Sequence, residues 1–463
     1  MERKNAWAAY AEDDSRVEAF AKAYCDFINN GKTERECVAY GEKLAKAHGF
    51  EDLNAVIRSG RKLEAGARVY VNWMGKSFML FVLGAKPLEE GMNILGAHID
   101  SPRIDVKQNP LYEDGDLAYL DTHYYGGIKK YQWVAMPLAL HGVIIKKNGE
   151  KVPVNIGEDE NDPVFCISDL LIHLAQEQMA KNAKDVVEGE ALNLIVGGRP
   201  LAGEEKDAVK ANVLKLLDDK YGVEEEDFLS AELEIVPAGK ARDMGFDRSM
   251  ILGYGHDDRV CAYPSMMAVL DYEGTPDYTL CCIITDKEEI GSVGATGMAS
   301  HDLENTVAEL YACTADYCEL AVRRCLRNSR MLSSDVSAGY DPNFASAFEK
   351  KNSAFLGRGI CFNKFTGSRG KSGSNDANPE FMASLRKIMD DAGVAFQTAE
   401  LGRVDLGGGG TIAYLCAKYG MNVIDSGIAV LSMHAPYEII SKVDLYEGYR
   451  CYCAFLKGAK PVD

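Results

Sequence analysis

Hydrophobic and polar positions along the chain follow two different periods. Residues 17–30 and 34–50 place apolar side chains three and four positions apart, which predicts two amphipathic helices. Residues 67–73 and 77–84 are rich in Val, Phe and Tyr, and we expect them to form a β-hairpin that turns near Met74. The N-terminal region therefore predicts two helices followed by a pair of strands.

Five later apolar segments each run into His, Asp or Glu within a residue or two. Short apolar runs are typical of strands buried on both faces of an α/β sheet, and ligands bind beyond the carboxyl ends of such strands. A polar residue after any one strand is ordinary, because loops are polar, but five such ends together indicate one convergent site. The five segments are residues 92–100, 250–258, 278–289, 329–335 and 427–434.

Residues 106–244 differ in character from the segments on either side and supply no His, Asp and Glu cluster of this kind. We therefore expect a discontinuous first domain of residues 1–105 and 245–463, interrupted by an inserted second domain of residues 106–244. The inserted domain has candidate strands at residues 133–147 and 231–237 and candidate helices at residues 169–183 and 206–222.

Composition and charge exclude several classes of protein. The chain has 463 residues, is 47% hydrophobic and 26% charged, and is typical of a globular protein. No apolar run reaches the roughly 18 residues that span a membrane, and the N-terminus has no apolar signal segment, so we expect a cytoplasmic protein without a membrane partner. The formal charge of -19 argues against nucleic acid as a partner, because Lys and Arg supply most of the affinity for phosphate backbones.

The residues at the ends of the five segments are suited to divalent metal ions. His98 and Asp100 form a His-x-Asp pair, in which the carboxylate can hold the second ring nitrogen of a metal-bound imidazole. Asp257, Asp335 and His434 follow further segments, and a carboxylate can bridge two cations. Zinc accepts both histidine nitrogen and carboxylate oxygen, although Mn²⁺ and Co²⁺ are also compatible with such ligands.

Two adjacent glutamates, Glu288 and Glu289, end the third segment. With Asp257 and Asp335 they bring four negative charges, which match two divalent cations better than one. A dinuclear hydrolase needs metal ligands and a general base beside the attacking water, so one glutamate would be a ligand and the other the base. The spacing of the residues does not decide which is which.

Six motifs, taken in their order along nearly the whole chain, resemble one known family. The motifs are HIDSP at 98–102, HDDRV at 256–260, DKEEIGS at 286–292, SSD at 333–335, GGGGT at 407–411 and SMHAPYE at 432–438. Together they closely resemble the aspartyl aminopeptidase family of dinuclear zinc metallopeptidases, in a bacterial-type form. The resemblance implies an α/β fold, with a mixed central sheet sandwiched by helices and an inserted, mainly-β dimerisation domain.

The resemblance also implies a role for each residue of the site. Glu288 would be the general base and Asp100 would orient His98. Two divalent ions per subunit, of which Zn²⁺ is the first choice, would share Asp257 as a bridge. Their remaining ligands would be His98 and Asp335 on one ion, and Glu289 and His434 on the other.

Further residues are implicated in substrate binding and assembly. The family forms dimers that build a tetrahedral dodecamer, and a histidine of the inserted domain reaches a neighbouring subunit's site. His173 is the candidate, although a histidine on an interface helix explains it equally well. Arg369 and Lys371 precede Ser374-Asn375, where the family places a basic residue that selects acidic side chains.

The amides of the glycine run, at Gly409 and Gly410, could hold a substrate oxygen, or the run could be a plain flexible turn.

The sequence as a whole predicts a metalloaminopeptidase that removes N-terminal residues, preferring Asp or Glu, from peptides. A dinuclear aminopeptidase of broad or neutral specificity, or a carboxypeptidase or deacylase on the same core, is the nearer alternative. A non-catalytic assembly scaffold is the more distant one.

Overall fold

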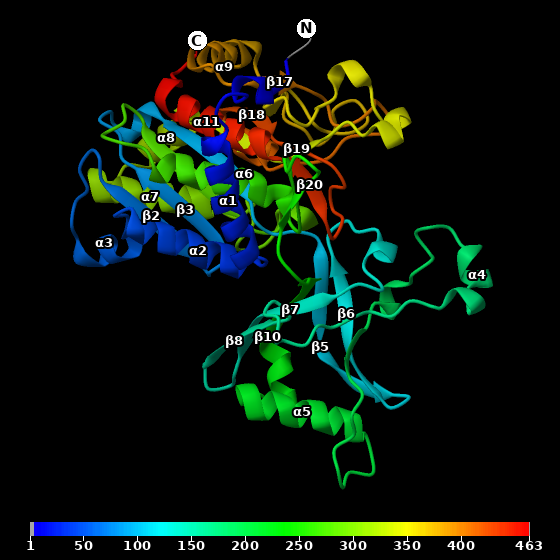
Figure 1. Cartoon of the computed structure of the whole chain (residues 1–463). Coiled ribbons are helices and arrows are strands. Elements are labelled where there is room, and N and C mark those ends of the chain that lie inside the picture. Colours follow the sequence, from blue (N-terminus) through cyan, green and yellow to red (C-terminus); the bar gives the residue numbers. More distant parts are fainter. Residues whose placement is uncertain (1–3, 463) are drawn as a thin grey trace. The chain divides into compact units, whose positions relative to one another are not determined.

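The computed structural model describes residues 4–462, which divide into two compact units (Figure 1). The chain leaves the first unit after Asp100 and returns to it at Ala241, a few residues from each boundary expected from the sequence. The short segment His434–Tyr437 groups with the second unit, whereas the sequence placed all of residues 245–463 in the first. The first unit comprises Met1–Asp100, Ala241–Met433 and Glu438–Asp463, and the second comprises Ser101–Lys240 and His434–Tyr437.

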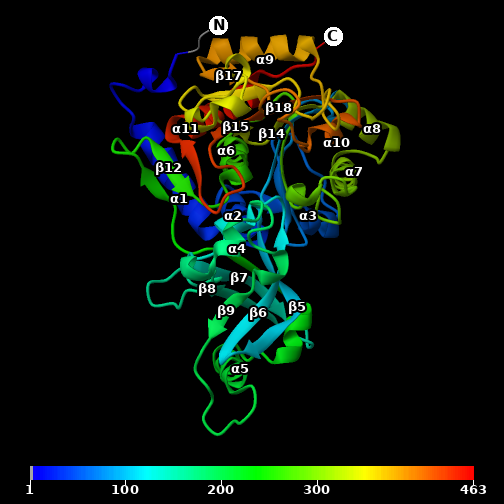
Figure 2. The same ribbon diagram turned by 90° about the vertical axis from the view of Figure 1, so that its right-hand side faces the viewer.

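The first unit is built on a nine-stranded mixed sheet with the strand order β1-β2-β3-β13-β4-β14-β18-β16-β17. Strands β14, β18 and β17 of this sheet are labelled in Figure 2. The expected hairpin is confirmed, because β2 and β3 pair antiparallel across a turn at Met74 and Gly75. At the centre, β13, β4 and β14 are neighbouring parallel strands, so their carboxyl ends meet at one edge. The strands are β1 (Glu51–Asp52), β2 (Arg68–Trp73), β3 (Ser77–Val82), β13 (Thr279–Thr285), β4 (Met92–His98), β14 (Arg330–Ser334), β18 (Asn422–Gly427), β16 (Ile360–Asn363) and β17 (Phe396–Thr398).

Two of the five apolar segments are not strands of this sheet, and that part of the prediction was wrong. In the second segment, β12 (Met250–Gly253) lies between β11 (Arg242–Met244) and β20 (Glu438–Ser441) in a separate three-stranded sheet. In the fifth, β19 (Ala429–Val430) forms a two-stranded sheet with β15 (Ser337–Ala338). An apolar run indicates that a strand is buried but carries no information about its partner, because pairing is decided by distant parts of the chain.

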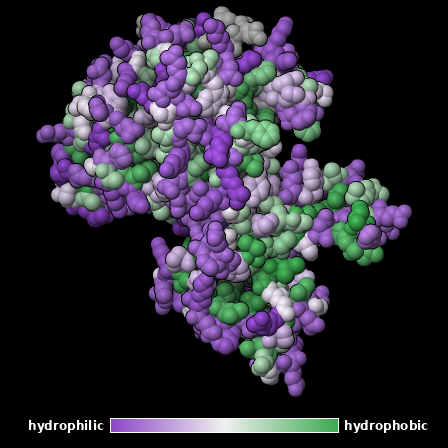
Figure 3. Space-filling view, viewed as in Figure 1, coloured by the Kyte–Doolittle hydropathy of each residue, from purple (hydrophilic) through white to green (hydrophobic). Residues whose placement is uncertain are grey.

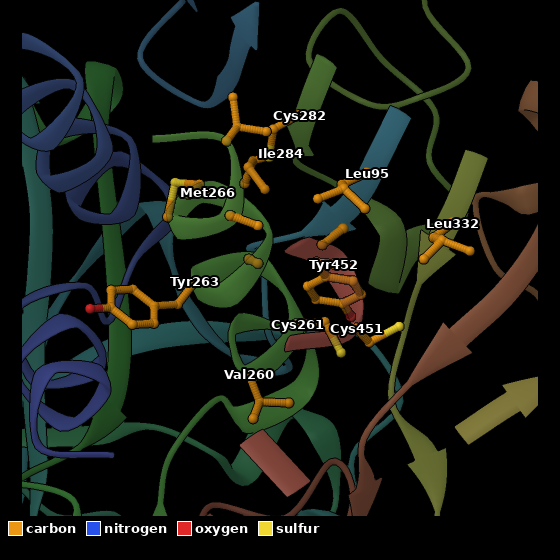
Figure 4. Close-up of a cluster of buried hydrophobic side chains, with 14 of the residues drawn as sticks. Leu95, Val260, Cys261, Tyr263, Met266, Cys282, Ile284, Leu332, Cys451 and Tyr452 are labelled. Carbon is orange, nitrogen blue, oxygen red and sulfur yellow. The ribbon is translucent and has the colours of Figure 1, made fainter. Parts of the chain in front are cut away.

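Side chains of the central strands alternate between two apolar cores, one on each face of the sheet. Leu95 and Cys282 belong to one core, whereas Ile94 and Ile283 belong to the other. Figure 4 shows the first core, where Cys261 of α6 (His256–Leu270) lies beside Cys451 and Tyr452 of α11 (Lys442–Gly458). Helices cover both faces, as expected for a sheet buried on both sides.

Both N-terminal helices expected from the sequence are confirmed, as α1 and α2. The first core is covered by α1 (Ser15–Asn30), α2 (Glu34–Ala47), α6 (His256–Leu270), α9 (Pro379–Ala392) and α11 (Lys442–Gly458). The second core is covered by α3 (Leu53–Ser59), α7 (Asp302–Thr314), α8 (Glu319–Asn328) and α10 (Ala413–Ala417). Among residues 4–462, every helix is too short or too polar to span a bilayer.

The second unit is mainly β, a six-stranded antiparallel sheet in the order β8-β7-β10-β5-β6-β9 that packs against the helix α5. An apolar hollow of about 580 Å³ lies between the sheet and α5, and Figure 3 shows apolar residues gathered on this unit. The elements are β5 (Arg103–Asp114), β6 (Leu117–Tyr125), β7 (Leu138–Ile145), β8 (Lys151–Ile156), β9 (Leu194–Gly197), β10 (Ala231–Pro237) and α5 (Ala208–Tyr221).

One of the two helices expected in this unit is present and the other is wrong. The helix expected at residues 206–222 is α5, but residues 169–183 form only a 3₁₀ turn at Ile172–Leu174 and the short α4 (Gln176–Met179). The apolar residues of this segment, Leu171, Ile172 and Leu174, are 54%, 70% and 68% exposed. Nothing within the unit covers them, and an isolated short helix gains too little from propensity alone to form.

Candidate metal centre

Three neighbouring strand ends bring predicted site residues together. Thr285 of β13 is level with His98 of β4, and Ser333 of β14 is level with Gly96, so Asp335 follows at the height of His98. The loop after β13 carries the two adjacent glutamates. The convergence expected from the sequence is therefore present for the first, third and fourth segments.

The second segment reaches the same place by a different route, through the first turn of α6. Gly255 precedes α6 with a φ of 75°, a left-handed conformation that glycine adopts without strain. The N–H of Asp257 then donates to Glu438 Oε2 at 3.0 Å, and Asp258 Oδ2 accepts from the N–H of His98 at 3.4 Å. Both aspartates are buried and lie against His98.

The imidazole of His98 lies at the centre of the site and is 1% exposed. Its Nε2 atom is 3.3 Å from Asp257 Oδ1, 3.9 Å from Asp335 Oδ1 and 4.0 Å from Glu288 Oε2. Its Nδ1 atom is 3.0 Å from the carbonyl oxygen of Asp100 and 3.3 Å from Asp100 Oδ1. With the Nδ1 proton donated to Asp100, the Nε2 lone pair faces the carboxylates, as a metal ligand requires.

The side chain of Asp100 also fixes the backbone of the two glutamates. Asp100 Oδ1 accepts the N–H of Glu288 and Oδ2 accepts the N–H of Glu289, both at 3.1 Å. Lys287 has a φ of 68°, and this left-handed residue turns the chain from β13 into the 3₁₀ helix Glu288–Ile290. One fully buried carboxylate therefore sets both the orientation of His98 and the position of the twin glutamates.

Burial and the neighbouring carboxylates make the carboxyl groups of Asp335 and Asp258 hard to ionise. Burial raises the pKa of Asp335 well above its usual value, and Glu288 and Asp257 raise it further, while His98 opposes the shift. Burial also raises the pKa of Asp258, again against His98. Another positive charge among the carboxylates would reverse this, because an opposite charge favours the ionised form.

The pKa of His98 is shifted in the opposite sense for an imidazole. Burial alone lowers it, but the hydrogen bonds to the carboxylates of Asp100 and Asp257 outweigh burial and bring the pKa well above its usual value. A metal ion must therefore compete with a proton for this nitrogen, as is usual for histidine ligands.

The described residues contain two groups whose ligand atoms lie within 4.8 Å of one another. They are His98, Asp258 and Asp335, and His98, Asp257 and Glu289. One imidazole nitrogen with carboxylate oxygens is a donor set that zinc accepts, so the residues fit a divalent metal ion. The sequence analysis did not predict Asp258 as a ligand, although it directly follows Asp257, because only the turn into α6 brings both aspartates to His98.

Two predicted site residues, His434 and His173, belong to the second unit. His434 has its Nδ1 atom 2.9 Å from the carbonyl oxygen of Gly127, and neither metal-type group of the described residues includes it. His173 lies in the exposed 3₁₀ turn Ile172–Leu174. Their roles as metal ligand and substrate contact stay predictions.

The structure brings together the predicted substrate-binding loops. Arg369 and Lys371 lie at the tip of a tight loop closed by backbone hydrogen bonds between Ser368 and Ser372 at 2.7 and 3.2 Å. Gly408 packs on this loop so closely that a Cβ atom there would lie 2.2 Å from the carbonyl oxygen of Gly367. The glycine run is therefore held against the basic loop rather than being a free turn.

The glycine run is also tied to the central sheet. Thr411 Oγ1 donates to Asp425 Oδ1 at 2.5 Å, and Asp425 of β18 is level with Ser333 of β14, two residues before Asp335. The run that contains Gly409 and Gly410 thus ends at β18, the strand next to β14, which Asp335 directly follows.

A buried imidazole among carboxylates at the carboxyl edge of a mixed α/β sheet defines a metallohydrolase type of centre. The profile of the family Peptidase_M18, described as Aminopeptidase I zinc metalloprotease, matches residues 27–456. A probable M18 family aminopeptidase 1 from Clostridium acetobutylicum is 58% identical over 98% of both chains. The chain belongs to this family and is a metal-dependent aminopeptidase, a hydrolase of peptide bonds.

Solved structures agree in fold over the whole chain. The crystal structure of an M18 aminopeptidase from Thermotoga maritima has a TM-score of 0.94 at 42% identity and covers 99% of this chain and 100% of its own. Aminopeptidase I from Clostridium acetobutylicum has a TM-score of 0.92 at 56% identity, with 98% and 99% coverage. The S. cerevisiae mApe1 dodecamer, at 21% identity and a TM-score of 0.76 with 96% and 97% coverage, shares the fold.

Removing the Asp100 carboxylate should disturb both the imidazole of His98 and the backbone of the two glutamates. Asp100→Ala deprives His98 and the N–H groups of Glu288 and Glu289 of a shared acceptor, so we expect metal affinity and kcat each to fall about 10- to 100-fold. Metal titration and steady-state kinetics on one preparation check this. Asp316→Ala, at an exposed aspartate of the same unit, is the control, and wild-type values for both quantities in Asp100→Ala would contradict the role.

Proposed function

We propose that this aminopeptidase works with two divalent metal ions, preferentially Zn²⁺, and with Glu288 as its general base. The ions would be held by His98, Asp257, Glu289, Asp335 and His434. The observation that carries the proposal is the pair of hydrogen bonds to Asp100, which fixes both glutamates beside His98. It supports different roles for the two, because Glu289 falls in a metal-type group and Glu288 in neither.

The chemistry follows from these positions. Bound metal ions polarise the scissile carbonyl and lower the pKa of the attacking water. Glu288, whose side chain is 16% exposed, would accept the proton of that water and return it to the leaving amine. Asp100 holds the backbone of Glu288 still through this transfer, so that proton movement does not require the loop to move.

The division of labour between the two glutamates can be tested by matched substitutions. Glu288→Gln keeps the size of the side chain and removes the base, so we expect metal content to stay and kcat to fall about 10²- to 10⁴-fold. Glu289→Gln should instead weaken metal binding about ten-fold or more, with activity partly restored by excess metal. Metal analysis by mass spectrometry together with kinetics separates the two outcomes. Equal loss of metal in both variants would overturn the assignment.

We further propose that Arg369 selects acidic N-terminal residues. Lys371 is the weaker candidate, because its Nζ atom is bound to Asp376 Oδ2 at 2.9 Å and lies 3.9 Å from the centre of the Phe365 ring. Arg369 is exposed beside it and has no ion pair among the described residues. A planar guanidinium suits a carboxylate, since it can donate two parallel hydrogen bonds.

Removing Arg369 should change the ratio of activity on acidic N-terminal residues to activity on leucine. In Arg369→Ala, the kcat/KM for N-terminal Asp and Glu relative to Leu should fall about 10- to 100-fold, the value of a charged hydrogen bond. Lys371→Ala should change the ratio less and serves as the matched control. The substrate panel should include an N-acylated peptide, whose cleavage would favour a deacylase or carboxypeptidase. An unchanged ratio in both variants would leave a broad aminopeptidase as the better reading.

We also propose that the chain assembles with itself, first as dimers and then as a dodecamer. The support is the exposed apolar turn of Leu171, Ile172 and Leu174, because soluble proteins rarely leave such residues uncovered side by side. His173 lies in this turn, so a subunit contact made by the turn would place His173 against the neighbouring subunit. The assembly of the yeast relative agrees with this proposal but is a property of that protein.

A negative charge introduced into the turn Ile172–Leu174 should therefore lower the mass of the oligomer. Ile172→Asp is expected to shift the species in native mass spectrometry from a high oligomer to smaller ones, because burying an unpaired carboxylate is costly. Leu320→Asp, at a 53% exposed leucine of α8, is the control and should leave the mass unchanged. The proposal fails if both variants keep the wild-type mass.

A further inference from the structure

A cavity of about 1310 Å³ opens in the first unit beside β17, the edge strand of the nine-stranded sheet. Its walls come from residues 340–358, from β17 and from α9, and Figure 2 shows the first of these, in yellow, next to α9. In strand order, β16 and β18 separate β17 from β14. The cavity therefore belongs to a sheet edge about 14 Å, or three strand spacings, from the strand that carries Asp335.

Four cations line this cavity, and none of them forms an ion pair within residues 4–462. They are Lys350, Lys351, Arg358 and Arg386, and no Asp or Glu is among the residues that line the walls. Glu349 is adjacent in the chain, but its carboxylate accepts from the N–H of Lys351 at 3.2 Å and from Asn352 Nδ2 at 2.6 Å. That carboxylate caps the 3₁₀ turn Lys350–Asn352 and forms no ion pair with the cations of the cavity within residues 4–462, although the N–H of Lys351 and, to a lesser extent, its charge lower the pKa of Glu349.

The walls of this cavity are cationic, whereas the chain as a whole is acidic. The chain has 70 acidic and 51 basic residues, so a carboxylate partner is available for most cations by composition alone. Four cations of like sign around one hollow repel one another, and the repulsion is relieved when an anion enters. A local positive field in a chain of net charge -19 is what an anionic ligand requires for binding.

Apolar groups hold two of the cations in place and provide a second kind of wall. The guanidinium carbon of Arg358 lies 4.3 Å from the centre of the Phe355 ring, and Lys350 Nζ lies 5.4 Å from the centre of the Tyr340 ring. Leu356 and Met382 add apolar surface to the same cavity. The cations would suit the anionic part of a ligand, and the apolar walls would suit its organic part.

We propose that this cavity binds a small organic molecule that carries a di- or triphosphate. Such a group brings about three or four negative charges, which match the four cations, whereas a single carboxylate would leave most of them uncompensated. Each of the two arginines can donate two parallel hydrogen bonds to phosphate oxygens. The volume exceeds the roughly 300–1,000 Å³ of ordinary ligand pockets, so the organic part fits as well.

Calorimetric titration with inorganic tripolyphosphate and with adenosine triphosphate tests the proposal. We expect one equivalent of each to bind per chain, adenosine triphosphate more tightly because of the apolar walls, and both more weakly as salt is raised. The double variant Arg358→Gln/Arg386→Gln should weaken both about ten-fold or more. Lys387→Gln is the matched control, since Lys387 follows Arg386 on α9 but is paired with Asp391 at 2.6 Å, and it should keep the wild-type affinity.

Each other outcome counts against the proposal. Absence of binding, equal affinity for the two probes, or equal weakening in the double variant and in Lys387→Gln would overturn it. Phosphates also bind metal ions, so binding that survives the double variant and is lost in Glu289→Gln would place the probes at the metal centre instead. A lower particle mass of the double variant, without phosphate binding by the wild type, would make the cavity a contact between copies of the chain. Lys350→Gln/Lys351→Gln, at two exposed side chains, repeats the test without disturbing the contact of Arg358 with Phe355.

Discussion

The carboxylate of Asp100 is fully buried, and the whole metal centre depends on the three groups that it holds. It accepts the N–H of Glu288 and of Glu289 and lies beside Nδ1 of His98, so it joins the end of β4 to the loop after β13. A charged group at this depth is stable only because these donors compensate for lost water. The same compensation makes the geometry rigid, since moving any partner would leave a buried charge poorly satisfied.

The sheet explains why so many carboxylates can be gathered at this point. Three parallel strands with both faces buried end together, and the residues that follow them are forced into the same small volume. The apolar cores on the two faces supply the stability that the crowded carboxylates oppose, because burial and repulsion raise the pKa values of Asp258 and Asp335. The arrangement is understandable as a site for divalent cations, whose charge converts that repulsion into attraction.

The two charged sites of the first unit use opposite electrostatics. The metal centre concentrates carboxylates around one imidazole, while the cavity beside β17 concentrates four cations without a carboxylate on its walls. Both depart from the average of an acidic protein surface, and both lie against strands of one sheet. The net charge of -19 argues against nucleic acid as a partner, but it is an average over the chain, and a cluster of cations can give one cavity the opposite charge.

Residue chemistry and local order carried much of what the sequence predicted. His98, Asp257, Asp335 and the pair Glu288 and Glu289 were predicted as site residues from residue types at the ends of apolar runs. The structure gathers His98, Asp257, Glu289 and Asp335 into its metal-type groups, while their roles stay predictions. The amphipathic period likewise predicted α1, α2 and α5 correctly. The helix expected at residues 169–183 failed because its apolar face has nothing in its own unit to pack against, and helices of that length depend on packing.

What the sequence by itself determined is the set of ligand-type residues, the α/β class and the family, because these follow from residue identity, spacing and hydrophobic period. Only the tertiary structure decided that β12 and β19 lie outside the central sheet, that Asp258 reaches His98 and that Asp100 serves both glutamates. It also decided that four cations from separate segments share one cavity. Pairing, the path of a turn and the convergence of distant side chains depend on contacts between residues far apart in the chain, and these leave no local pattern to read.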